Sequence, residues 1–184
     1  MNKAFFLDRD GVINVEVNYL HTPEETVLNE GTAEAIRKIN EAGYLAIVVS
    51  NQAGIAYGMY GMDDVKKVEN KIRELLAPAK IDAFYYCPHH AEKGVIPEYT
   101  IDCSCRKPKP GMLLQSAADF DVDLSQSFMI GDRLSDIHAG DAAGVKASVM
   151  VLTGHGHKEL AKAQQEGQIV KDDILRAVEY LLNL

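Results

Sequence analysis

The sequence predicts an α/β protein with a doubly wound, mostly parallel sheet, and three observations support this prediction. Short apolar runs alternate with longer segments of helical periodicity, which is the pattern that βαβ units produce. Residues 45–49, with the sequence Leu-Ala-Ile-Val-Val, form an unbroken apolar run of the kind found in strands covered on both faces. The length of 184 residues suits one domain, spanning residues 1–184, which can bury a sizeable core without disulfides.

The first five expected elements follow from local patterns. Residues 4–7 are apolar and predict a buried strand, and residues 32–42 predict a helix that has two isoleucines on one face and a glycine after its end. The second strand covers residues 45–49. Residues 62–77 carry apolar side chains at helical spacing, with an aspartate near the start and a proline after the end, and residues 83–86 form a short strand.

The second half of the chain continues the same alternation. Strands are expected at residues 128–130 and 148–152, and helices at residues 112–120, 134–143 and 172–182. Around Gly156 we expect a loop, with His155 and His157 as ordinary loop residues, because isolated histidines without a partner set are seldom ligands. In parallel sheets ligands bind beyond the carboxyl ends of the strands, so those ends are the place to look for chemistry.

Composition and charge exclude several classes of protein. Hydrophobic residues make up 47% of the chain and charged residues 25%, which is the balance of an ordinary globular protein. Because the formal net charge is −8, we expect no nucleic-acid partner, since phosphate neutralisation needs a basic surface. Asp8, Arg9 and Asp10 interrupt the first apolar run, and no run approaches the ~20 residues of a membrane span. We therefore expect a cytoplasmic protein without a membrane partner.

Polar side chains follow the ends of several expected strands. Asp8 and Asp10 follow the first strand, Ser50 follows the second and Asp132 follows the fourth. The segment 106–111, Arg-Lys-Pro-Lys-Pro-Gly, adds positive charge, and its prolines predict an extended backbone. Each signal alone has an ordinary explanation as a solvated loop or a helix start. Because the carboxyl ends of parallel strands meet at one edge of a sheet, we expect these side chains to converge.

Together these residue types meet the needs of phosphoryl transfer. A carboxylate can act as a covalent nucleophile, and a second acid can move a proton to the leaving oxygen and later from water. Mg²⁺ prefers carboxylate, water and phosphate oxygens. A lysine and a hydroxyl can stabilise the phosphoryl oxygens, with Lys109 as a second candidate for that lysine. The candidate catalytic residues are Asp8, Asp10, Ser50 and Lys107.

The loop 87–105 carries a complete set of zinc ligands. The candidate ligands are Cys87, His89, Cys103 and Cys105, in two pairs that are separated by thirteen residues. Three thiolates and one imidazole leave no position for water, so a tetrahedral Zn²⁺ would be structural. His90 is an alternative to His89. The loop has little apolar content, so zinc would order it and would position Arg106 and Lys107, which follow directly.

These motifs, in this order, resemble the haloacid-dehalogenase-like phosphatases over essentially the whole chain. The matching residues are Asp8, Asp10, Ser50, Lys107 and Asp132. The resemblance implies a Rossmann-like fold in which Asp8 forms an aspartyl-phosphate and Asp10 acts as general acid and base. It also implies that Asp8, Asp132 and the backbone carbonyl of Asp10 hold Mg²⁺, and that Ser50 and Lys107 hold the phosphoryl group.

Longer stretches resemble one family within this group more closely. Residues 6–14, 51–55 and 105–108, together with the zinc loop, resemble the D-glycero-D-manno-heptose 1,7-bisphosphate 7-phosphatases. This resemblance implies the absence of a large cap domain and the removal of the 7-phosphate from a small sugar phosphate. The product would serve ADP- or GDP-heptose and surface polysaccharide synthesis. The implied substrate contacts are Glu16, Val17, Asn18, Tyr19, Ser50, Asn51, Gln52, Ala53, Arg106, Lys107 and Arg133.

Three alternatives remain open on the sequence. Histidinol-phosphate phosphatases share the fold and a similar zinc loop, although the thirteen-residue spacer here is longer and favours the heptose family. A non-catalytic, zinc-ordered binding module would need a broken set of carboxylates, and a mutase or phosphotransferase would pass the phosphoryl group to a sugar. Tyr57 stands where the heptose family commonly has an arginine, which bears on the distal phosphate contact. We expect a monomer, and the anomer at C1 stays open.

Overall fold

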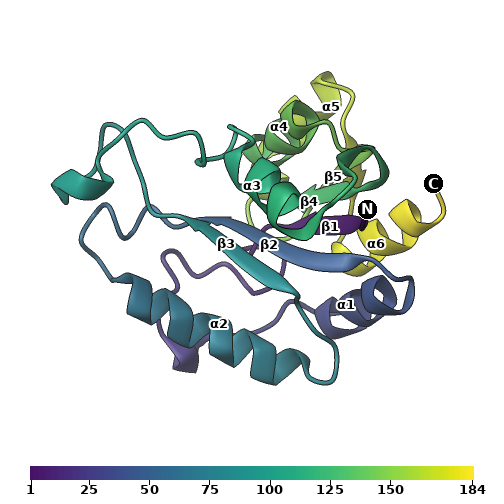
Figure 1. The fold of residues 1–184 in the computed structure, drawn as a ribbon, viewed down its shortest axis with the longest axis horizontal. Coiled ribbons are helices and arrows are strands. Elements are labelled where there is room, and N and C mark those ends of the chain that lie inside the picture. The colour runs from purple at the N-terminus through teal and green to yellow at the C-terminus, as the bar shows by residue number, and fades with distance from the viewer.

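A six-stranded parallel sheet forms the centre of the computed structural model, which describes residues 1–184 (Figure 1). The strands, in the spatial order β3-β2-β1-β4-β5-β6, are β1 (Ala4–Leu7), β2 (Leu45–Asn51), β3 (Ala83–Cys87), β4 (Phe128–Gly131), β5 (Ala147–Val151) and β6 (Ile169–Lys171). The helices are α1 (Thr32–Glu41), α2 (Met62–Leu76), α3 (Gly111–Phe120), α4 (Leu134–Ala143), α5 (Gly156–Gln165) and α6 (Ile174–Leu182). None of these helices combines the length and the apolar character that crossing a membrane would require.

Helices cover both faces of the sheet, as the sequence predicted. In β1, Phe5 and Leu7 pack into a core shared with α1, α2 and α6, whereas Ala4 and Phe6 face the core shared with α3 and α4. All four side chains are completely buried, which explains why the strand is apolar at every position and not only at alternate ones. Figure 1 shows α2 and α6 below the sheet and α3, α4 and α5 above it.

Every predicted strand and helix is present, with ends that shift by at most two residues. One shift affects a candidate site residue. The strand expected at 45–49 continues through Ser50 and Asn51, because both residues pair with β3. Ser50 therefore lies within β2 and not in the loop after it, which corrects the sequence-based placement.

The prediction of a loop around Gly156 was wrong, because α5 and β6 occupy this part of the chain. Helix α5 is mostly polar and buries only Gly156 and Ala163, so it lacks the apolar periodicity from which helices are predicted. Strand β6 has only three residues and lies at the edge of the sheet. His157 lies in the first turn of α5, and His155 immediately precedes this helix.

The strand order reverses beside β1, and this reversal determines where the candidate site lies. From β1 the chain proceeds outward to β2 and β3, then returns to β4 on the other side of β1. The residues that follow β1, β2 and β4 therefore meet at a single switch point, where parallel sheets bind ligands. The loop after β3 reaches away from the sheet at the left of Figure 1 before it returns to α3.

Candidate active site

Three buried aspartates meet at the switch point of the sheet. Asp8 directly follows β1, Asp132 directly follows β4, and Asp136 lies in the first turn of α4. Side-chain oxygens of the three residues lie within 4.8 Å of one another, and no residue of the three is more than 8% exposed. The backbone N–H of Asp8 donates to the carbonyl of Ile130 at 3.0 Å, which fixes the end of β1 against β4. Asp8 and Asp132 thus converge as expected, and Asp136 joins them.

Two glycines shape the space around Asp132. Gly11 and Gly154 both adopt positive φ angles, of +90° and +57°, and a side chain on either residue would collide with the Asp132 carboxylate. The backbone N–H of His155 donates to Oδ2 of Asp132 at 2.7 Å, whereas Oδ1 is buried without a hydrogen-bond partner. A buried carboxylate oxygen without a donor is costly, and it suits a bound cation.

The charges in this cluster do not balance. Burial, followed by repulsion from Asp136, raises the pKa of Asp8 to about 7. Burial, followed by the charges of Asp8 and Asp136, raises the pKa of Asp132 to about 9. The Nζ atom of Lys107 lies 2.8 Å from Oδ1 of Asp8 and 2.6 Å from Oδ1 of Asp136. One ammonium among three carboxylates leaves excess negative charge, so the donor set fits a divalent cation with oxygen ligands such as Mg²⁺.

Asn51 anchors the buried lysine to the end of β2. Its Oδ1 atom accepts the backbone N–H of Lys107 at 3.0 Å, and its Nδ2 atom donates to the carbonyl of the same residue at 3.1 Å. The Lys107 ammonium also donates to the carbonyl of Val49 at 2.7 Å. Burial lowers the pKa of Lys107, but the carboxylates of Asp136 and Asp8 raise it by more than burial lowers it, so the side chain stays charged.

The prediction of an extended segment at 106–111 was wrong. The backbone N–H of Lys109 donates to the carbonyl of Arg106 at 2.9 Å, and this bond closes a turn. As a result, Lys109 faces away from Lys107. Its Nζ atom contacts Asp102 at 2.5 Å and the carbonyl of Cys103 at 3.0 Å, outside the cavity that contains the aspartates. The geometry therefore favours Lys107 over Lys109 as the phosphate-binding lysine.

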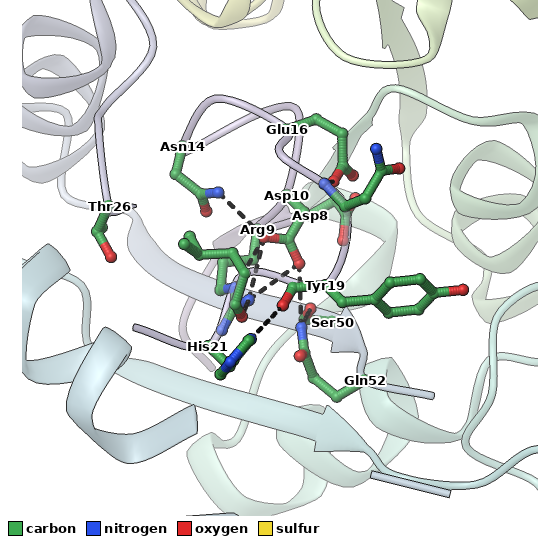
Figure 2. Close-up of polar contacts among 12 residues, drawn as sticks. Asp8, Arg9, Asp10, Asn14, Glu16, Tyr19, His21, Thr26, Ser50 and Gln52 are labelled. Carbon is green, nitrogen blue, oxygen red and sulfur yellow. Dashed lines mark hydrogen bonds and ion pairs between the residues drawn. The ribbon is translucent and has the colours of Figure 1, made fainter. Parts of the chain in front are cut away.

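Asp10 lies beside the cluster, and donors from three residues hold its carboxylate (Figure 2). These donors are Nε and Nη2 of Arg9, Nδ2 of Asn14 and Nε2 of Gln52, at 3.0–3.3 Å. The Gln52 amide also donates to Oγ of Ser50 at 2.8 Å. The side chain of Asp10 remains 19% exposed toward the cavity, so it can approach a bound ligand while its orientation is fixed.

A cavity of about 510 Å³ opens above the aspartates. The expected contact residues that line it are Glu16, Asn18, Tyr19, Asn51, Gln52, Ala53, Arg106, Lys107 and Arg133. Two expected contacts do not line it. The side chain of Val17 is 41% exposed outside the cavity, and Ser50 is buried beneath Gln52 with 1% exposure. The lining residues that the sequence analysis did not assign are Tyr57, Tyr60, His90, Lys93, Pro108, Ser135, Asp136 and His155. Of these, Asp136 had a usable signal in its position four residues after Asp132, and Tyr57 had one because it stands where the resembled family commonly has an arginine.

The four candidate zinc ligands cluster on the loop that leads to Lys107. Ligand atoms of Cys87, His89, Cys103 and Cys105 all lie within 4.8 Å of one another, with measured separations of 3.0–3.7 Å. Sulfur atoms on a tetrahedral zinc ion lie about 3.8 Å apart, given Zn–S distances of about 2.3 Å. The alternative ligand His90 is not in the cluster, because its ring accepts the backbone N–H groups of Glu92 and Lys93.

Comparisons with known proteins agree with this geometry. A sequence profile described as HAD-hydrolase-like matches residues 104–177. D-glycero-beta-D-manno-heptose-1,7-bisphosphate 7-phosphatase of Pasteurella multocida is 42% identical over 167 residues, which cover 89% of each chain. The corresponding alpha-named enzyme of Photorhabdus laumondii is 42% identical over 85% of this chain and 86% of its own. The crystal structure of D,D-heptose 1.7-bisphosphate phosphatase from B. bronchiseptica, complexed with magnesium and phosphate, has a TM-score of 0.85 and 34% identity and covers 98% of both chains.

The raised pKa values of the aspartates predict that magnesium stabilises the protein more at high pH. Asp8 and Asp132 keep protons in the folded state that the unfolded chain, with pKa values near 3.8, has released. Their contribution to the free energy of unfolding therefore falls as the pH rises through about 7 and about 9. A bound divalent cation would replace those protons, so the Mg²⁺-induced rise in Tm should be larger at about pH 9 than at about pH 6. Thermal melts with and without Mg²⁺, with zinc retained throughout, measure this difference, and an equal rise at both pH values would contradict the assignment.

The ligand geometry also predicts which histidine holds zinc. His89→Ala should lower the zinc content from one ion per chain to near zero, and should reduce hydrolysis of a generic phosphate ester because Lys107 loses its support. His90→Ala, the matched control from the neighbouring position, should keep its zinc. Elemental analysis of the purified variants measures both. Loss of zinc in the His90 variant with retention in the His89 variant would reverse the assignment.

Proposed function

Because the chain belongs to the haloacid-dehalogenase-like hydrolases, in the family of the D-glycero-D-manno-heptose-1,7-bisphosphate 7-phosphatases, we propose that it removes the 7-phosphate of a heptose 1,7-bisphosphate in a Mg²⁺-dependent reaction. The observation that carries the choice of substrate is the charge distribution in the cavity. Asp8, Asp10, Asp136 and Lys107 lie on its floor, and its walls carry cations that no carboxylate neutralises.

The proposed mechanism uses two acids in two steps. A carboxylate oxygen of Asp8 attacks phosphorus while the bond from phosphorus to the C7 oxygen breaks, and Asp10 donates its proton to that leaving oxygen. Water then attacks the aspartyl-phosphate, Asp10 takes the proton of this water, and inorganic phosphate and free Asp8 result. Lys107 holds the charge of the phosphoryl oxygens throughout, from its place beside Asp8. Ser50 lies under Gln52, so we assign it a supporting hydrogen bond beneath the site.

We assign the two metals to the two clusters. Asp8, Asp132 and the backbone carbonyl of Asp10 would hold Mg²⁺, and the partnerless Oδ1 of Asp132 supports this choice. When bound, the ion would balance the charge of the carboxylates and polarise the phosphoryl group. Asp136 binds Lys107, so we assign it the task of fixing the ammonium. Cys87, His89, Cys103 and Cys105 would hold a structural Zn²⁺.

Unpaired cations on the wall favour a substrate with a second anionic group. Arg106, Lys93 and Arg133 line the cavity, and none of them forms an ion pair, although the chain as a whole carries a net charge of −8. The one acid on the wall outside the cluster, Glu16, lies 3.4 Å from the ring of His155. A second phosphate would meet these cations favourably. Histidinol phosphate instead carries an ammonium group, which the same wall would repel.

The neighbourhood of Tyr57 fits this interpretation. Its ring packs edge-on against Tyr19 at 5.9 Å and at a tilt against His90 at 5.6 Å. Burial raises the pKa of its hydroxyl, and the charge of Arg106 opposes this rise. Tyr57 therefore shapes the wall without supplying the charge of the arginine that the family commonly has there. We propose that Lys93, on the zinc loop, supplies that charge in this chain.

The proposed enzyme is a monomer. We propose that the enzyme acts in the cytoplasm and that its heptose 1-phosphate product enters ADP- or GDP-heptose and surface polysaccharide synthesis. The relatives include enzymes named for both anomers, so both belong in the test.

The first test is a substrate panel of both heptose 1,7-bisphosphate anomers and histidinol phosphate. We expect kcat/KM for one bisphosphate to exceed that for histidinol phosphate by about 100-fold, which corresponds to roughly 2.7 kcal/mol. Asp8→Asn should keep the fold and lose turnover, so it serves as the blank. Analysis of the products distinguishes free phosphate from transfer to a sugar, and a preference for histidinol phosphate would transfer the assignment to the alternative.

The second test removes the wall cation. Lys93→Met should raise KM for the bisphosphate about fivefold, because an exposed charged contact contributes roughly 1 kcal/mol, and should leave KM for heptose 7-phosphate unchanged. Lys109→Met is the matched control, since this lysine lies in the same connection between β3 and α3 but outside the cavity. Equal KM changes with both substrates in the Lys93 variant would contradict its role at the distal phosphate.

A further inference from the structure

Arg9 is a charged side chain in an unexpected place. It is the largest side chain that the protein buries completely, with 0% exposure, although it stands between two acids in a loop motif. Placing a guanidinium in the interior is costly unless an anion and further acceptors receive its donors. The contacts of Arg9 should therefore show which groups compensate for this burial.

The guanidinium of Arg9 binds both Asp10 and the main chain of a distant loop. Its Nη2 atom lies 3.0 Å from Oδ1 and 3.1 Å from Oδ2 of Asp10, and its Nε atom lies 3.3 Å from Oδ1. The same Nη2 atom donates to the carbonyl of Leu20 at 3.1 Å. Figure 2 shows this fork beneath the Asp10 carboxylate. Because a guanidinium is planar, these contacts define the plane in which that carboxylate lies.

The loop that Arg9 binds through the carbonyl of Leu20 also forms a wall of the cavity. Asn18 and Tyr19, which precede Leu20, adopt left-handed backbone conformations with φ angles of 56° and 57°, and both residues line the cavity. The Nδ1 atom of His21 donates to the carbonyl of Tyr19 at 2.8 Å. One guanidinium thus couples the position of Asp10 to the position of residues that would contact the sugar.

A second set of contacts restrains Asp10 from the other side. Nε2 of Gln52 donates to Oδ2 of Asp10 at 3.1 Å, and Oε1 of Gln52 accepts the hydroxyl of Tyr60 at 2.7 Å. Burial raises the pKa of Tyr60, so this hydroxyl stays protonated. It donates to the oxygen of the Gln52 amide, which leaves the nitrogen of that amide facing Asp10. The ring of His21 stacks on Tyr60 at 5.3 Å with an angle of 4° between the planes. Both oxygens of Asp10 are therefore held, one by Arg9 and Asn14, the other by Arg9 and Gln52.

We propose that Arg9 is the positioning residue for proton transfer, holding Asp10 at the leaving oxygen by tying it to the loop that contacts the sugar. This inference rests on the proposed function. As the bond from phosphorus to oxygen breaks, the electron pair stays on the leaving oxygen and Asp10 donates its proton there. In the second step, Asp10 takes a proton from the attacking water. Arg9 touches neither the substrate nor the reacting atoms, and it acts through the geometry of Asp10, because proton transfer needs donor and acceptor within about 3.2 Å.

The experiment compares two leaving groups in Arg9→Met and Arg9→Lys. An alkoxide leaving from a sugar phosphate needs a proton, whereas p-nitrophenolate leaves without one. We use kcat/KM because it reports only the steps up to the first irreversible one. For Arg9→Met, kcat/KM with the sugar phosphate should fall about 100-fold, while kcat/KM with p-nitrophenyl phosphate should fall less than about fivefold. Arg9→Lys keeps a buried charge but loses the planar fork, and it should show the same selective loss.

Arg73→Met is the matched control. The guanidinium of Arg73 also binds a carboxylate, that of Glu69, and a backbone carbonyl, that of Ile81 at 2.7 Å, but it lies outside the cavity. This variant should change kcat/KM for the two substrates by the same factor. Equal losses with both leaving groups in the Arg9 variants, or full activity on the sugar phosphate, would overturn the proposal. If Arg9→Met does not fold, as thermal melting would show, Arg9→Lys alone decides between these outcomes.

The series also separates this proposal from the choice of substrate. If heptose bisphosphate is not hydrolysed by the wild-type protein, the proposed function fails, but the leaving-group comparison still runs with glycerol phosphate as the alkyl ester. If heptose bisphosphate is a good substrate and the Arg9 variants lose activity equally on both esters, only the positioning role fails.

Discussion

Mutual repulsion among three buried carboxylates is the constraint on which the rest of the site depends. Asp8, Asp132 and Asp136 lie closer together than unbalanced charges tolerate, and the surrounding structure supplies only part of the balance. Lys107 contributes one positive charge, and its own burial is possible only because two of these carboxylates receive it. The negative charge that remains makes this cluster a fitting site for a divalent cation with oxygen ligands.

Support for this lysine comes from two independent directions. Asn51 binds both backbone groups of Lys107 from the end of β2, while the cysteine and histidine cluster brings together the two ends of the loop that precedes it. The sheet alone could not position a residue that follows such a long loop with little apolar content. The acid side of the site is different, because Asp8 and Asp132 follow strands directly and need no such support. Arg9 adds a third restraint, and it acts on the acid that lies farther from the sheet.

Sequence patterns predicted the parts of the molecule in which apolar segments are buried and polar residues lie at the ends of strands. Parallel strands are apolar at every position, and the aspartates follow them, so both the sheet and the convergence at its edge could be read from the chain. Helix α5 was missed because its side chains are mostly polar, and the turn at 106–111 was missed because Asn51 and backbone bonds shape it. The burial of Arg9 depends on Leu20, eleven residues away, through a carbonyl that has no signature in the sequence.

Gly11 and Gly154 leave the chain little freedom at one point of the site. Both pack against the Asp132 carboxylate, and both hold backbone angles that other residues adopt only under strain. Divergence toward a new substrate can exchange the tyrosines and cations of the rim, since these face an open cavity. It cannot add even a methyl group at either glycine without displacing an acid. Evolutionary tolerance in this enzyme is therefore set by the residues that lack side chains as firmly as by those that carry the charges.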